Sequence, residues 1–66
     1  MDRKKQYYEV ITDAWNLLKQ NIDQVDYDRI AAEVHELDGK YHGTPEYTFA
    51  NDVIVAVMEE ITRIHG

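Results

Sequence analysis

The sequence predicts an all-α protein, an antiparallel three-helix bundle formed by a single domain over residues 1–66. Three observations lead to this fold class. Three stretches place apolar residues three and four positions apart, which is the spacing of one helix face. Glycine and proline interrupt the chain only at residues 39–45 and at the C-terminus. The β-branched run at residues 53–55 has no second β-rich run to pair with, so we assign it to a helix.

The first predicted helix covers residues 3–22. Its apolar stripe alternates steps of three and four and consists of Tyr8, Ile11, Trp15, Leu18 and Ile22. Val10 and Leu17, one heptad apart, form a second apolar edge, so the apolar arc covers about half of the helix and exceeds the ~100° needed for one core contact. We expect this helix to touch two neighbours, with Trp15 as the anchor of the core because it lies at the centre of the stripe.

The second predicted helix covers residues 26–41. Either Asp23 or Asp26 is suited to cap its N-terminus. Gly39 either ends the helix or lies inside it at a cost of about 1 kcal/mol relative to alanine. We favour the longer helix because a tyrosine keeps the spacing of the apolar stripe, which consists of Tyr27, Ile30, Ala31, Val34, Leu37 and Tyr41.

The third predicted helix covers residues 45–64. In the segment before it, residues typical of a helix end are followed directly by residues typical of a helix start. Gly43 is able to take the left-handed conformation that ends a helix. Thr44 is suited to be the N-cap, and Pro45 fits a first helical turn. Glu46 places negative charge near the positive end of the helix dipole. The apolar stripe of this helix consists of Tyr47, Ala50, Ile54, Val57, Met58, Ile61 and Ile64, with Val53 at its border.

Short connections at residues 23–26 and 42–45 predict that consecutive helices are antiparallel neighbours. The core is therefore predicted to contain the central members of the three stripes: Ile11, Trp15, Leu18, Ile30, Val34, Leu37, Ala50, Ile54, Val57, Met58 and Ile61.

The charge of the chain argues against nucleic-acid binding. There are 13 acidic residues against 7 basic ones, and residues 23–43 hold six acidic and two basic groups. Binding to phosphates needs lysine and arginine clustered on one face. The longest apolar run, residues 53–58, is far shorter than the 18–20 residues of a membrane span, and we expect no signal peptide because no apolar stretch follows the basic residues at positions 3–5. With no cysteine in the chain, we expect a cytoplasmic protein.

Metal and calcium sites are not expected. His42 and His65 lie near opposite ends of the third helix, about 30 Å apart, and His35 completes no HExxH motif. No register of the aspartates at residues 23–38 places both the glycine and the final carboxylate of a calcium loop correctly.

An enzyme is not expected either, and no cofactor is implied. The chain has no serine, no cysteine and no glycine-rich phosphate loop. Its carboxylates at residues 36 and 59 have the i,i+4 spacing to basic residues that is ordinary for helix surfaces.

The segment YHGTPEYTFANDVIVAVMEEITRI, together with AWNLL at residues 14–18, resembles small uncharacterised helical proteins of phages and mobile elements of Gram-positive bacteria. The resemblance rests on hydrophobic spacing and the Gly-Thr hinge. It implies a cytoplasmic accessory protein and carries over no activity.

We expect a protein that works by contact with a protein partner, including a second copy of itself in a homo-oligomer. The first and third helices have more apolar surface than a bundle of three helices needs. The predicted interface consists of apolar groups that a small bundle leaves uncovered: Val10, Leu17, Phe49 and Val55.

An alternative is an acidic inhibitor or nucleic-acid mimic whose carboxylates replace phosphates on a basic protein groove. The acidic face in that interpretation consists of Asp28, Glu33, Glu36, Asp52, Glu59 and Glu60. A bundle that binds a small molecule or a metal is a third interpretation, which a thermal shift with divalent ions tests.

Overall fold

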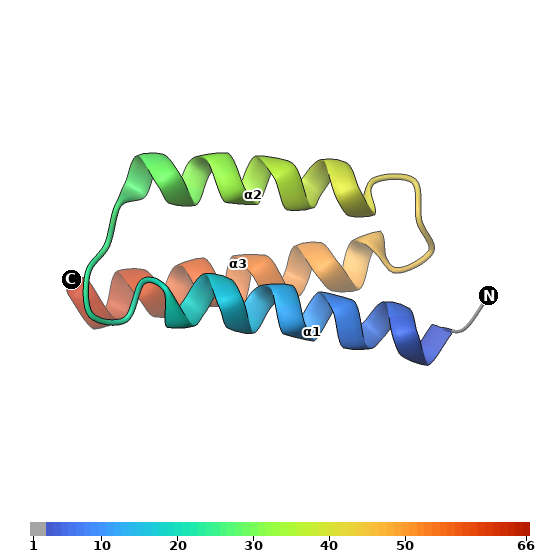
Figure 1. The fold of residues 1–66 in the computed structure, drawn as a ribbon, viewed down its shortest axis with the longest axis horizontal. Helices are drawn as coiled ribbons and strands as arrows, with labels where there is room; N and C mark the ends of the chain where they lie inside the picture. Colours follow the sequence, from blue (N-terminus) through green and yellow to red (C-terminus); the bar gives the residue numbers. More distant parts are fainter. Residues whose placement is uncertain (1–2) are drawn as a thin grey trace.

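A computed structural model describes residues 3–66, which form three helices: α1 (Arg3–Lys19), α2 (Tyr27–Tyr41) and α3 (Tyr47–His65). The helices α1 and α3 run in the same direction and α2 runs in the opposite one (Figure 1). Each helix packs against the other two, with the largest contact between α1 and α3. The predicted all-α three-helix bundle is therefore confirmed.

Helix α1 ends three residues before the predicted end at residue 22. The cause is Asn21, which is fully buried and donates a hydrogen bond from Nδ2 to the Leu17 carbonyl oxygen at 2.7 Å. A short polar side chain that bonds nearby backbone competes with the helical ladder. The backbone N–H of Asn21 turns to the carbonyl of Leu18, three residues back, at 3.0 Å. This tighter bond closes the helix.

Helix α2 begins at Asp26, one of the two predicted N-caps. Its Oδ1 accepts hydrogen bonds from the backbone N–H groups of Asp28 at 3.1 Å and Arg29 at 3.2 Å. Both groups would otherwise lack a partner at the helix start. Gly39 lies inside the helix, so the longer of the two predicted helices is the correct one.

The connection to α3 confirms two parts of its prediction and corrects two. Gly43 has a φ of +83°, the left-handed conformation expected of it. Thr44 does not cap α3. Its Oγ1 instead donates a hydrogen bond to the Tyr41 carbonyl oxygen at 2.7 Å and so satisfies the end of α2. Pro45 lies in the turn, since α3 starts at Tyr47.

Glu46 lies at the N-terminus of α3, as predicted, and is only 2% exposed. One carboxylate oxygen lies 3.6 Å from the Nε of Arg3, and the other has no hydrogen-bond partner among residues 3–66. The favourable helix dipole contributes to holding this charge in a buried place.

The core consists of two clusters that meet along the axis of the bundle. One holds Leu17, Ile30, Ile54 and Ile61, and the other holds Val10, Tyr41 and Ala50. Ala14, between Val10 and Leu17 on the same face of α1, is also buried, and its small side chain lets the helices approach closely.

Three of the predicted core residues are wrong: Ile11, Trp15 and Met58 are exposed. The physical reason for the two on α1 is the rotation of that helix about its axis. Asp13 accepts a hydrogen bond from the Tyr41 hydroxyl at 2.6 Å and pairs with Lys40 at 2.8 Å, which holds that side of α1 against α2. Most of the predicted stripe then points outward, and only Leu18 packs partly against the core.

Candidate protein interface

An exposed apolar stripe runs along the outer side of α1. Tyr8 is 69% exposed, Ile11 is 56% exposed and Trp15 is 53% exposed. Their spacing of three and four residues places them on one side of the helix. Ile22 extends the stripe just past the end of α1 and is 40% exposed. Large apolar side chains scattered singly are normal on a surface, but a contiguous row of them marks a contact site.

The stripe continues across the seam between α1 and α3. The rings of Tyr7 and Phe49 pack edge to face with centroids 5.1 Å apart, and Phe49 is 37% exposed. Ala56, also exposed, follows two turns later on the same side of α3. We call this surface the α1–α3 face, and it consists of Tyr8, Ile11, Trp15, Ile22, Phe49 and Ala56.

Charges of opposite sign border this face. Lys19 lies at the edge of α1, about 40° around the helix from Trp15. Asp52 and Glu59 lie at the far edge of α3, and both are exposed. The face therefore has an apolar middle, Lys19 at its α1 border and two carboxylates at its α3 border. Arg63, which lies two turns after Ala56 on the same side of α3, is exposed and pairs with Glu60.

The structure divides the four predicted interface residues into two groups. Val10 and Leu17 are each 1% exposed in the core, so their assignment to an interface is wrong. These two residues, one heptad apart, instead lie on the side of α1 that packs against both α2 and α3. Phe49 and Val55 are exposed, as expected of interface residues, but they lie about 120° apart around α3.

Val55 belongs to a separate surface. It lines a shallow groove of about 410 Å³ together with Met58, Glu59 and Thr62. All four residues come from one helix, and the groove is open to solvent along its length. It offers no convergent polar groups of the kind that orient a small ligand.

The predicted acidic residues are not gathered on one face. Glu33 and Glu36 line a groove between α1 and α2 with Asp13, whereas Asp52 and Glu59 lie on α3. Two members of the predicted set, Glu33 and Glu60, pair with arginines. Arg29 lies 3.9 Å from Glu33, and Arg63 Nε donates to Glu60 at 3.0 Å. Asp28 stands apart, in the first turn of α2.

The strongest polar cluster of residues 3–66 connects α1 to α2. Asp13 bonds both Tyr41 and Lys40, and Glu9 lies 3.8 Å from Lys40. Burial, the hydrogen bond to Asp13 and the charges of Asp13 and Glu9 together raise the pKa of the Tyr41 hydroxyl. The Tyr41 hydroxyl therefore keeps its proton at neutral pH and donates a hydrogen bond to Asp13, a contact that clamps α1 to α2.

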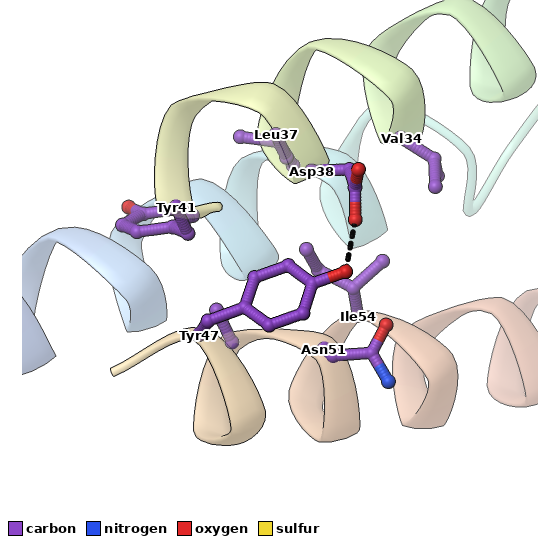
Figure 2. A pocket seen from close by; sticks show the side chains of 8 residues that line it. Val34, Leu37, Asp38, Tyr41, Tyr47, Asn51 and Ile54 are labelled. Atoms are coloured by element: carbon purple, nitrogen blue, oxygen red, sulfur yellow. Dashed lines mark hydrogen bonds between the residues drawn. The ribbon is translucent and has the colours of Figure 1, made fainter. Parts of the chain in front are cut away.

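A second clamp connects α2 to α3. The Tyr47 hydroxyl donates a 2.6 Å hydrogen bond to Asp38 across a small cavity, as Figure 2 shows. This bond raises the pKa of Tyr47. The cavity, lined also by Tyr41, Asn51 and Ile54 among others, measures about 30 Å³. That volume holds a water molecule but no organic ligand.

The histidines have separate places in the structure. His42 packs edge to face against Tyr47, and His65 Nε2 lies 2.6 Å from the Asn21 carbonyl oxygen at the other end of the bundle. Within residues 3–66, no three histidine, aspartate or glutamate side chains are grouped to hold a metal ion. Over the same part of the chain, none of the helices has the length and apolar character needed to cross a membrane.

Comparison with protein-family models, curated proteins and solved structures finds no match to this chain. The resemblance to phage and mobile-element proteins and the cytoplasmic location therefore stay predictions.

Proposed function

We propose that this chain is a non-enzymatic protein that acts through protein–protein contact, and that the α1–α3 face is its contact surface. The observation that supports the proposal is the row of Tyr8, Ile11 and Trp15, each more than half exposed on one side of α1. Aromatic residues are enriched in the cores of protein interfaces, and tryptophan and tyrosine are frequent among the residues that contribute most to binding.

The size of the face supports a specific contact. Its three aromatic side chains, Tyr8, Trp15 and Phe49, alone expose roughly 300 Å². A standard interface buries about 800 Å² on each partner, about one sixth of the 4751 Å² accessible surface of this molecule. Two helices side by side, each about 25 Å long, supply an area of that order. We therefore expect association in the micromolar range, including self-association.

The alternative function, an acidic mimic of nucleic acid, has weaker support. A mimic needs its carboxylates in a row on one surface, to replace the regular spacing of phosphates. Here Glu33 and Glu60 are engaged by arginines of the same chain, and the remaining carboxylates lie on different sides of the bundle. A complex with a basic protein that weakens steeply with added salt would favour the mimic instead.

Light scattering after size-exclusion chromatography tests the proposal with a matched pair of variants. Trp15→Asp places a charge in the middle of the α1–α3 face, and Tyr27→Asp places the same charge on α2, away from that face and at similar exposure. We expect the wild-type chain and Tyr27→Asp to associate at high micromolar concentration and Trp15→Asp to stay monomeric. Circular dichroism checks that both variants keep their helices. A wild-type chain that is strictly monomeric at that concentration would overturn self-association.

A further inference from the structure

We propose that the partner on the α1–α3 face is a second copy arranged with α1 of each copy against α3 of the other. The two-fold axis of this dimer runs parallel to the helices. The four helices of the interface then alternate around the axis as α1, α3, α1 and α3. This inference rests on the proposed function and adds the identity and orientation of the partner.

The positions of residues along the bundle axis determine which groups meet in this arrangement. Three contacts join α1, or the turn after it, to the α3 region: Arg3 with Glu46, Tyr7 with Phe49 and Asn21 with His65. Their sequence separations are 43, 42 and 44, so residue n of α1 lies level with about residue n + 43. A rotation about an axis parallel to the helices keeps every height unchanged. Trp15 therefore lies near the level of the partner's Ala56, a small residue that leaves room for a large ring.

The border charges distinguish this arrangement from the other symmetric one. Lys19 lies level with about residue 62, three residues from Glu59, which corresponds to about 4.5 Å along the axis. Crossed packing places Lys19 beside the partner's Glu59 on both sides of the dimer. The reach of a lysine side chain spans that offset. The partner's Arg63 lies nearer to the same level, and its ion pair with Glu60 offsets its repulsion of Lys19.

The competing arrangement has its two-fold axis perpendicular to the helices, so that α1 faces α1 and α3 faces α3. It brings the Asp52 and Glu59 borders of the two copies together. It also brings Lys5 opposite Lys19 of the partner if the helices cross near the middle of the apolar stripe. Like charges placed in register across an interface destabilise it.

Two features make the border charges available to a partner. The ion pairs that form among residues 3–66 involve neither Lys19 nor Glu59. Both residues are exposed, and they lie on opposite borders of the face of one copy. In a dimer related by the two-fold axis, Lys19 of each copy contacts Glu59 of the other, so the same ion pair forms two times.

Charge reversal tests the orientation. Lys19→Glu alone and Glu59→Lys alone each create two repulsive pairs in crossed packing, so we expect the dimer dissociation constant of each to rise about three- to tenfold at low salt. An equimolar mixture of the two single variants forms a mixed dimer with two attractive pairs, one in the original sense and one reversed. We expect that mixture, and the double variant, to return to the wild-type constant. Asp28→Lys, on α2, is the control for a change of net charge.

The outcomes separate the orientation from the proposed function. Weakening by both single variants together with rescue in the mixture supports crossed packing. Failure of the mixture to rescue, or tighter association of Lys19→Glu, overturns it in favour of α1 against α1. If Trp15→Asp dissociates the dimer while the reversals do nothing, the face is the interface and only the orientation is wrong. If Trp15→Asp has no effect on association, the proposed function fails as well.

Discussion

The two apolar sides of α1 have similar side chains and opposite surroundings. One side holds Val10, Ala14 and Leu17, which are buried between α2 and α3. The other holds Tyr8, Ile11 and Trp15, which are larger on average and face outward. Hydrophobicity alone therefore does not decide which side of a helix enters the core.

The difference arises from shape and from the polar groups beside each stripe. The buried side has a small residue at its centre, so two helices fit closely around it. It also borders Asp13, which the Tyr41 hydroxyl and Lys40 of α2 hold. The outer side has Ile11 at its centre and the large rings of Tyr8 and Trp15 to either side of it, and all three stay exposed. A helix with apolar groups on two sides therefore buries the side that fits closely and leaves the other exposed.

The largest effect on stability is expected for a substitution on the buried side of α1, compared with one on its exposed side. Leu17→Ala should lower the free energy of unfolding by about 2–5 kcal/mol, because it opens a cavity in the principal core cluster. Ile11→Ala on the outer side should change it by less than about 1 kcal/mol in the monomer. Urea unfolding at a concentration below that of association measures both. Equal losses for the two variants would contradict the assignment of sides.

An intermediate effect is expected at the turn that sets α3 against the buried side. Gly43→Ala forces an alanine to a φ of +83° and should cost about 1–2 kcal/mol, although no atom within 4 Å obstructs its Cβ. Gly39→Ala, inside α2 and equally unobstructed, should instead stabilise the fold by about 0.5–1 kcal/mol. Thermal unfolding of the two variants compares them directly. A loss of stability for both would show that the α2 glycine has a packing role.

The smallest effect is expected at the clamp that sets the rotation of α1. Tyr41→Phe removes one hydrogen bond to Asp13 and should cost about 1 kcal/mol at neutral pH. Because the folded state raises the pKa of Tyr41 above its ordinary value of 10.0, the unfolded chain releases this proton first. Its contribution to stability is therefore complete below pH 10 and is lost as the pH rises above it.

The measurement is urea unfolding of the wild type and of Tyr41→Phe between pH 8 and 11. The wild type should lose stability over the alkaline part of this range, and the variant should lose less. Tyr47→Phe serves as a comparison, since the pKa of Tyr47 is raised by a bond between α2 and α3. Parallel curves for wild type and Tyr41→Phe would show that the Asp13 contact does not hold α1 in place.

The sequence predicted correctly those features of the fold that depend on interactions between neighbouring residues. The apolar spacing identified three helices, Asp26 caps the second, and Gly43 closes it with its left-handed backbone. These features depend on neighbours within one helical turn. The early end of α1 was missed because it depends on the burial of Asn21 beneath the end of α3.

The candidate interface was only half predictable from the sequence. Phe49 and Val55 were expected to be exposed and are, but Val10 and Leu17 were assigned to the wrong side of α1. The sequence did contain a signal for the buried side of α1. Asp13 lies beside Val10 and Leu17 on the helix, and Lys40 lies in the last turn of α2 as a potential partner for it. Its use required knowing that these two residues meet, which is a contact over 27 positions.

The sequence by itself determined that the chain forms three amphipathic helices, that the first of them has apolar residues on two sides, and that serine and cysteine are absent. Periodicity, capping and residue chemistry are properties of neighbouring positions, so they can be read before folding. Only the tertiary structure decided which apolar side of α1 is core and which is surface. That choice depends on how the helices rotate to fit one another, and the fit is set by contacts between residues far apart in the chain.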